Sequence, residues 1–152
     1  MHVLRCSPCF GHHLLQEHDT VVRDGLSAIV NIHMSDIHWL QASIPVKSGG
    51  LEIRRAVSLA IPVFLASAVA TSDLQSAILS RALQNVDKEV ELAHSLWCSF
   101  TTTSTPVGYL QTSQRAWDAP MVERNCQTLL DNATSDIDKA RLLAVKADHG
   151  SE

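Results

Sequence analysis

Two cysteines and two histidines near the start of the chain have spacings that suit a metal site. Cys6 and Cys9 are separated by two residues, and His12 and His13 follow them. Thiolates at this spacing can hold one tetrahedral zinc ion, and a nearby imidazole can complete the ligand set. No second closely spaced cysteine pair follows. We therefore favour thiols that are structural or incidental and bind no metal. If a metal is bound, these four residues are the candidate ligands. A redox-active cysteine pair is a further alternative.

Other catalytic arrangements are missing from the sequence. Eight histidines are present, but no HExxH, facial-triad or His-carboxylate motif accompanies them. The sequence also has no G-x-S-x-G elbow for a serine nucleophile, no Walker loop and no GxGxxG. We therefore expect no catalytic residues and no cofactor in a chain that is not an enzyme.

A glycine pair followed by two arginines offers a candidate anion site. Gly49 and Gly50 could expose backbone amides to a phosphate at the start of a helix, with Arg54 and Arg55 alongside. The alternative, which we favour, is a plain turn before that helix. The formal net charge of −4, with its acidic excess after residue 55, also argues against a basic face that would bind nucleic acid unaided.

The composition predicts that helices position these residues. The chain is 45% apolar and only 5% aromatic, and this favours an all-α fold with a core of aliphatic side chains. The start MHVLRCSPCF lacks the pattern of a secretory leader, so we expect reduced cysteines and an intracellular protein, cytoplasmic or nuclear. The apolar stretch 56–70 is interrupted by polar residues and is shorter than a bilayer requires, so we expect no membrane partner.

Hydrophobic periodicity and capping signals predict an irregular bundle of about six helices joined by short loops. The expected helices span about 13–31, 35–43, 54–70, 72–78, 87–100, 122–133 and 135–144. In the first of them, the spacing of Leu15, Val22, Leu26 and Ile29 predicts one buried face. Gly25 lowers the stability of the same helix, so tertiary contacts must hold the helix there. We expect a neighbouring element to approach Gly25 closely.

A stretch rich in Thr, Ser and Pro interrupts these helices. The segment TTTSTPVG at 101–108 predicts the longest and most mobile linker. It divides the chain into residues 1–100 and residues 101–152, which hold the linker and a C-terminal helical pair. These parts form either two domains or one.

One block in the first half combines specific residues at fixed offsets. The segment WLQASIPVKSGGLEIRRAVSLAIPVFLAS, at 39–67, resembles the region that follows the polymerase core in non-LTR retrotransposon reverse transcriptases. There, a pattern close to W-x-Q-A-x-L-P-x-x-x-G-G-L-G-I-R precedes an Ala-rich helix that ends in L-A-S. MHVLRCSPCF resembles the segment leading out of the thumb, and RAWDAP and DKARLLAV resemble weaker continuations. The signature positions in this chain are Trp39, Gln41, Pro45, Gly49, Gly50, Leu51 and Arg54.

The chain departs from this pattern at Glu52, where the family usually has a third glycine. If that glycine adopts a positive φ, we expect glutamate to strain the turn by roughly 1 kcal/mol or more. Decay of the sequence after loss of selection is one explanation for such a change.

The resemblance implies RNA-directed DNA synthesis for the parent protein of a transposable element. That chemistry needs carboxylates that hold two metal ions at an F/Y-A-D-D hairpin, and no such tetrapeptide occurs here. The resemblance therefore implies a non-catalytic fragment, thumb-like and connection-like over 1–100, that meets nucleic acid only in the context of a full-length parent. One alternative is a domesticated helical module that binds a protein partner through the apolar face of 56–70. Another is a metal-dependent nucleic-acid accessory domain that uses Cys6 and Cys9.

Overall fold

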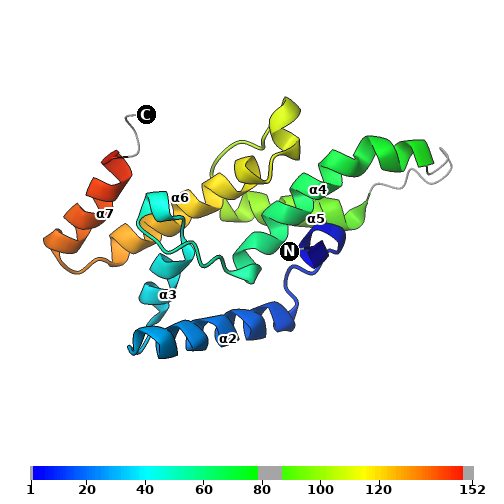
Figure 1. The fold of residues 1–152 in the computed structure, drawn as a ribbon. Coiled ribbons are helices and arrows are strands. Elements are labelled where there is room, and N and C mark those ends of the chain that lie inside the picture. Colours follow the sequence, from blue (N-terminus) through cyan, green and yellow to red (C-terminus); the bar gives the residue numbers. More distant parts are fainter. Residues whose placement is uncertain (1, 79–86, 149–152) are drawn as a thin grey trace. The chain divides into compact units, whose positions relative to one another are not determined.

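The computed structural model describes residues 2–78 and 87–148, and this part of the chain is helical without any strand (Figure 1). The prediction of an all-α fold is confirmed. The described elements are α1 (His2–Cys6), α2 (His13–Val30), α3 (Asp36–Ser43), η1 (Val46–Ser48), α4 (Ala56–Ile78), α5 (Lys88–Phe100), η3 (Gly108–Thr112), α6 (Gln114–Asn132) and α7 (Asp136–Asp148), in which η marks a 3₁₀ helix.

Side-chain caps start three of these helices where the sequence predicts them. Ser35 accepts a hydrogen bond from the His38 amide over 3.2 Å at the start of α3. Asp87 accepts one from the Glu89 amide over 3.0 Å at the start of α5. Ser135 caps α7 in the same way. Each cap satisfies an amide that has no partner within its helix, which explains why short polar residues mark these starts.

Two predicted boundaries are wrong. The expected break before Ser72 does not occur, because α4 continues to Ile78. The Ser72 hydroxyl donates to Val69 O over 3.0 Å, so it bonds inside a continuing helix instead of capping a new one. Helix α6 begins at Gln114, eight residues before the expected start at Val122, and contains Pro120. Val86, which begins the apolar pattern that predicts the helix at 87–100, lies outside the described part of the chain.

The internal contacts divide the chain into two compact units, each built from two separate stretches. The first unit comprises 1–12 and 57–121, and the second comprises 13–56 and 122–152. These limits differ from the division near residue 100 expected from the sequence, which stays a prediction. Helix α6 contributes residues to both units. The first unit extends to residue 121, so residues 101–107 of the predicted linker lie inside it.

Two tryptophans form the centre of the first unit. Trp97 of α5 and Trp117 of α6 are almost fully buried and meet edge to face, with ring centroids 5.1 Å apart. The Trp97 indole N–H also donates to the Trp117 carbonyl over 2.9 Å. Helix α4 packs its most buried segment against this pair, with Phe64 and Leu65 in the same cluster. The expectation of an aliphatic core is therefore wrong for the first unit, because Phe64, Trp97 and Trp117 are part of its buried cluster.

The core of the second unit confirms part of the face predicted for α2. Val22 and Leu26 pack against a buried cluster that includes Trp39 and Met34. Ile29, expected on the same face, is 82% exposed, because it lies in the last turn of α2 where the chain leaves the core. Gly25 has no atom within 4 Å of the place where a Cβ would be, so the expected close neighbour is absent from the described residues.

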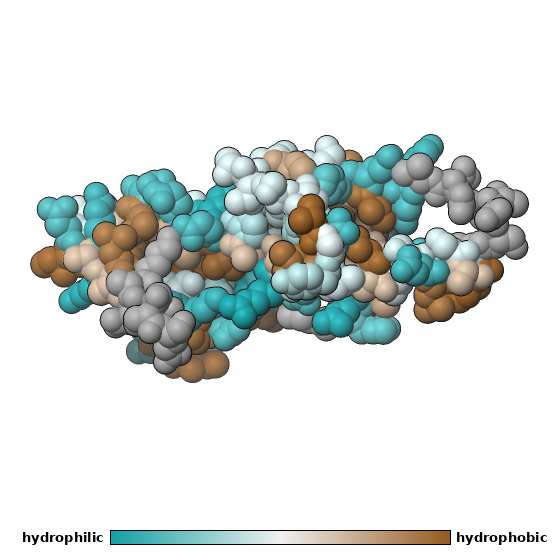
Figure 2. All heavy atoms as spheres, turned by 90° about the horizontal axis from the view of Figure 1, so that it is seen from above, coloured by the Kyte–Doolittle hydropathy of each residue, from teal (hydrophilic) through white to brown (hydrophobic). Residues whose placement is uncertain are grey.

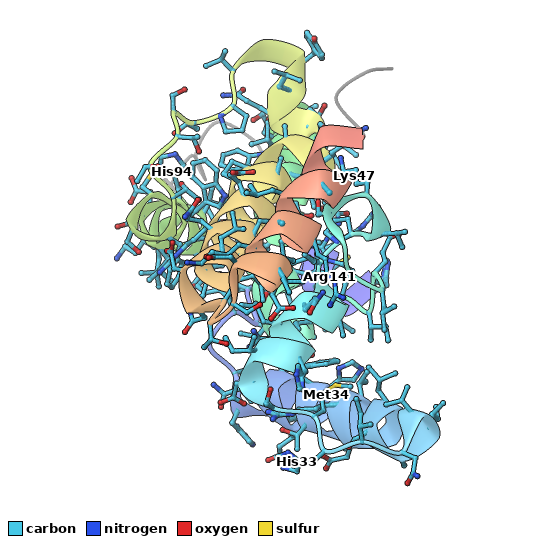
Figure 3. The ribbon with its side chains drawn as sticks, turned by 90° about the vertical axis from the view of Figure 1, so that its left-hand side faces the viewer. His33, Met34, Lys47, His94 and Arg141 are labelled. Carbon is cyan, nitrogen blue, oxygen red and sulfur yellow. The ribbon has the colours of Figure 1, made fainter. Side chains whose placement is uncertain are left out.

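Arg23 holds the corner between α2 and α3. Its Nε donates to Met34 O over 3.0 Å, its Nη2 donates to the same carbonyl, and its Nη1 lies 2.7 Å from Asp36 Oδ1. Asn31 ends α2 with φ 52°, a left-handed conformation that asparagine tolerates. Met34 is buried at this corner (Figure 3). Arg23 therefore fixes the direction in which α3 leaves α2.

Helix α4 is apolar enough to raise the question of a membrane. Its 23 residues reach the length and mean hydropathy of a candidate membrane span, which is longer than the stretch 56–70 considered from the sequence. The core helix of a water-soluble protein meets the same criterion. Residues 59–66 of α4 are buried inside the chain, and this burial accounts for their hydrophobicity.

A buried carboxylate of α2 binds the first residue of α4. Asp19 is 5% exposed, and its Oδ1 accepts a hydrogen bond from the Ala56 amide over 2.7 Å. A carboxylate at this position satisfies an orphan amide and lies at the positive end of the helix dipole. Asp19 therefore acts as a cap supplied from 37 residues away.

We expect Asp19→Ala to lower the free energy of unfolding by about 1–2 kcal/mol, because the Ala56 amide loses its acceptor. Asp19→Asn should lose less, since its side-chain carbonyl can still accept. Glu17→Ala, an exposed change in the same helix, should alter stability by less than about 0.5 kcal/mol. Urea unfolding followed by circular dichroism measures all three, and equal stability of Asp19→Ala and Glu17→Ala would contradict the assignment.

Candidate functional site

Four of the signature positions, Pro45, Gly49, Gly50 and Leu51, lie in a turn that folds back onto the end of α3. The Ala42 carbonyl accepts hydrogen bonds from the amides of Leu51 and Ile53, each over 3.1 Å. The Ile44 carbonyl accepts one from the Glu52 amide over 2.9 Å. The last carbonyls of a helix have no partners within the helix, and here the returning chain supplies them. We call residues 45–53, which make this reversal, the return turn.

Pro45 and Gly49 shape the first half of the return turn. The Pro45 carbonyl accepts hydrogen bonds from the amides of Ser48 and Gly50, over 2.8 and 3.1 Å. Gly49 ends the short helix η1 with φ 88°, a left-handed conformation that glycine adopts without steric cost. The Gln41 amide group reaches from α3 and donates to Gly49 O over 3.4 Å. The turn is therefore held from both its backbone and the side chain of a signature residue.

Gly50 is required for a different reason. A Cβ added to it would lie 2.1 Å from Ile44 O and 2.5 Å from Gln41 O. Real Cβ atoms do not approach carbonyl oxygens so closely, and both oxygens belong to the backbone at the end of α3. The glycine pair therefore combines one position that needs a positive φ with one that needs an absent side chain.

The remaining signature residues differ in exposure. Trp39 is 5% exposed and anchors α3 in the core of the second unit. Leu51 is 59% exposed, although its amide takes part in the return turn. Arg54 lies between the return turn and the start of α4, and is half-buried. The family-signature residues predicted from the sequence therefore come together as one structural motif around α3, and not as a reactive cluster.

Glu52 occupies a strained backbone position in this motif. Its φ is 58°, in the left-handed region that residues with a side chain rarely adopt. Strain at Glu52 is expected from the sequence if φ is positive there, and the structure has that conformation. Left-handed backbone costs an L-residue about 1–2 kcal/mol relative to its usual conformations.

The phosphate site considered for the glycine pair is not formed. The Gly49 amide donates to Val46 O over 2.9 Å, and the Gly50 amide donates to Pro45 O. The amide of Ala56, where α4 begins, donates to Asp19. These donors are used inside the protein, so the preferred interpretation of a turn before a helix is correct.

The candidate zinc ligands do not assemble. Within residues 2–78 and 87–148, no group of three or more His, Cys, Asp or Glu side chains is placed to hold a metal ion. Cys6 is exposed at the end of α1, where its Sγ lies 3.6 Å from His2 Nε2. Cys9 follows in a turn, and its carbonyl accepts from the His12 amide over 3.1 Å. The set of Cys6, Cys9, His12 and His13 is therefore close in sequence but is not a coordination site in this fold.

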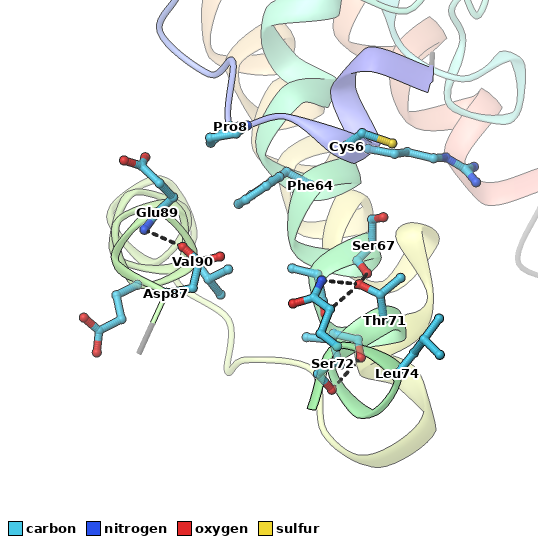
Figure 4. Close-up of a pocket in the computed structure, with 15 residues that line it drawn as sticks. Cys6, Pro8, Phe64, Ser67, Thr71, Ser72, Leu74, Asp87, Glu89 and Val90 are labelled. Atoms are coloured by element: carbon cyan, nitrogen blue, oxygen red, sulfur yellow. Dashed lines mark hydrogen bonds between the residues drawn. The ribbon is translucent and has the colours of Figure 1, made fainter. Parts of the chain in front are cut away.

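A cavity of about 700 Å³ in the first unit is lined by residues of α1, α4 and α5 (Figure 4). Its polar wall is formed largely by α4. The Thr71 hydroxyl donates to Ser67 O over 2.9 Å and in turn accepts a hydrogen bond from Gln75 Nε2 over 2.9 Å. Ser72 is also bonded to the backbone of its own helix. These groups are engaged with one another, so they do not converge on a ligand.

A second cavity, of about 440 Å³, is lined by residues of α3, the end of α6 and α7 in the second unit. It contains charges of both signs. Arg141 Nη1 lies 3.6 Å from Asp138 Oδ1, and both side chains are largely exposed to solvent. Exposed pairs of this kind contribute little binding energy, and the mixed charge favours neither an anion nor a cation.

The partner surface expected on residues 56–70 is largely inside the protein. Residues 59–66 are buried, so this apolar face packs against the chain's own core and cannot receive another protein without unfolding. Hydrophobic side chains that do reach the surface lie in separate patches between polar ones on the face shown in Figure 2. A protein partner on this helix would therefore have to bind outside residues 59–66.

Sequence reasoning missed Asp19, although a signal was present. Asp19 lies four residues after Leu15 and three before Val22, so it falls on the predicted apolar face of α2. A carboxylate on such a face must find a hydrogen-bond donor when it is buried. That donor, the Ala56 amide, could not be identified before the fold was known.

Gly50 is crowded by backbone oxygens and Gly25 faces open space, so substitution of each by alanine tests the two environments. We expect Gly50→Ala to destabilise the protein by about 3 kcal/mol or more, because the new methyl group would overlap backbone oxygens. Gly25→Ala should stabilise it by about 0.5–1 kcal/mol, since the space is open and alanine favours helix. Thermal unfolding of both variants measures the difference, and a stable Gly50→Ala protein would show that the return turn is formed differently.

Comparisons with protein-family models, with curated proteins and with solved structures find no match to this chain.

Proposed function

We propose that this chain is a non-catalytic helical fragment derived from a retrotransposon RNA-directed DNA polymerase. In the parent protein it would form the helices that follow the polymerase core and connect it to later segments. Its residues would position and support those segments and would take no part in the polymerase chemistry. Contact with nucleic acid would arise only when the catalytic part of the parent supplies the basic surface.

The observation that carries this proposal is the backbone of Glu52. The family pattern has glycine at this position, and φ there is 58° in this chain, a conformation for which glycine is the natural residue. A pattern drawn from sequence and a dihedral angle taken from the structure therefore agree on where a third glycine belongs. This agreement supports the proposed origin of the turn.

The other signature positions support the proposal in the same way. Gly50 has no room for a side chain, Gly49 has a positive φ, and Gln41 bonds to the turn. A pattern that joins these residues at fixed offsets is what a return turn on α3 requires. The pattern therefore records a structural motif, which fits a supporting role better than a catalytic one.

Restoring the family's glycine tests this interpretation. We expect Glu52→Gly to raise the free energy of unfolding by about 1 kcal/mol, because strain at a positive φ is removed. Glu52→Ala is the matched control, since it removes the same carboxylate and keeps the strain, and it should leave stability nearly unchanged. Urea unfolding compares the three proteins. If Glu52→Gly is no more stable than Glu52→Ala, the structural basis of the resemblance is lost.

Two further measurements address origin and activity. The genomic sequence upstream of the codon for Met1 should contain an intact or decayed polymerase core with an F/Y-A-D-D motif; an unrelated gene there would contradict the proposed origin.

The purified chain, supplied with Mg²⁺, a primed RNA template and deoxynucleotides, should incorporate no nucleotide above background. Template-dependent incorporation by the chain alone would show that it is catalytic.

A further inference from the structure

One thiol in the first unit faces an imidazole that is held from its other side. Cys98 is exposed near the end of α5, and its Sγ lies 3.9 Å from each ring nitrogen of His94, one helical turn earlier. His94 Nε2 lies 3.0 Å from Thr105 Oγ1 in the connection after α5. When the Nε2–H donates this hydrogen bond to the Thr105 hydroxyl, Nδ1 keeps the lone pair that can accept a proton from the thiol.

The buried core keeps this imidazole in place. The His94 ring meets the edge of the Trp117 ring, with centroids 6.1 Å apart and planes at 83°. Trp117 is itself 2% exposed, and its indole N–H donates to Gln111 O over 2.7 Å. Cys98 as nucleophile, His94 as base and Thr105 as the group that orients the base therefore lie next to one another in space. Sites with an activated nucleophile have this arrangement.

The exposed thiol of Cys6 differs from this arrangement. Cys6 has the same spacing from a histidine, and its Sγ lies 3.6 Å from His2 Nε2. Both of these residues are exposed on the five-residue helix α1, so solvent surrounds the imidazole. Cys9 and Cys126 are half-buried. The chain thus contains a thiol–imidazole pair that is anchored and a comparable pair that is not.

We propose that Cys98 is a covalent modification site that exchanges with low-molecular-weight disulfides, with His94 as its proton acceptor and Thr105 as a positioning residue. The Cys98 proton moves to Nδ1, and the thiolate attacks one sulfur of the disulfide. The S–S bond of the reagent breaks, and a mixed disulfide forms on Cys98. The departing thiolate takes the proton from the imidazolium, so no external oxidant is needed. Neither of the two cavities described above is lined by Cys98, which favours modification from solvent over turnover of a bound substrate.

The test treats the full chain at neutral pH with a small amount of 5,5′-dithiobis(2-nitrobenzoate), the aromatic disulfide used as probe. N-ethylmaleimide stops the exchange, and peptide mass spectrometry assigns the label to each cysteine. We expect Cys98 to react about tenfold faster than Cys6, since general-base assistance contributes at least that much to proton transfer. Equal rates at Cys98 and Cys6 would overturn the proposal.

Three variants separate the role of His94 from a merely structural one. His94→Gln, which cannot accept the proton, should slow Cys98 about tenfold and leave Cys6 unchanged. His2→Gln is the matched control and should change the Cys6 rate by less than about twofold, because that imidazole is not oriented. Thr105→Val keeps the base but removes its anchor and should slow Cys98, whereas Thr105→Ser should restore the rate. If His94→Gln unfolds, the pair of Thr105 variants decides, and equal Cys98 rates in Val and Ser forms would contradict the role of Thr105.

Discussion

The Ala42 carbonyl accepts two hydrogen bonds from the returning chain, and the local structure of the second unit depends on this interaction. It satisfies the end of α3 with the amides of Leu51 and Ile53, which brings Ile53 back to the core beside Trp39. Close approach is possible only because Gly50 has no side chain. From there the chain reaches Ala56, whose amide meets Asp19. A few backbone hydrogen bonds thereby determine where one helix ends and the next begins.

Features set by neighbouring residues could be predicted from the sequence. Ser35 and Pro45 bracket α3, and Asp87 starts α5, because caps and proline act within one turn of the residue that carries them. The predicted break at Ser72 was wrong because the local signal there fits two different structures. A serine followed three residues later by a glutamine can cap a new helix or bond inside an old one, and Ala68, Ala70 and Leu74 nearby favour a continuous helix. Local signals of this kind cannot distinguish the two outcomes.

The candidate site was harder to predict, because closeness in sequence was a poor guide to closeness in space. Cys6 and Cys9 suggested chemistry that the fold does not assemble. Asp19 and Thr105 were overlooked, and each acquires its role from a partner on another element, at Ala56 and His94. Even the glycine pair had an ambiguous meaning until the carbonyls facing Gly50 were known. Tertiary contacts, and not motifs, decide what these residues do.

The distribution of tryptophan gives the two units separate optical signals. Of the three tryptophans, Trp97 and Trp117 lie together in the first unit, and Trp39 lies in the core of the second. Indole fluorescence responds to the polarity and packing around each ring. A protein that retains Trp39 and has phenylalanine at the other two positions would report on the second unit alone, and the reverse replacement would report on the first. The chain therefore contains native probes that can show whether its two units melt in one cooperative step or in two.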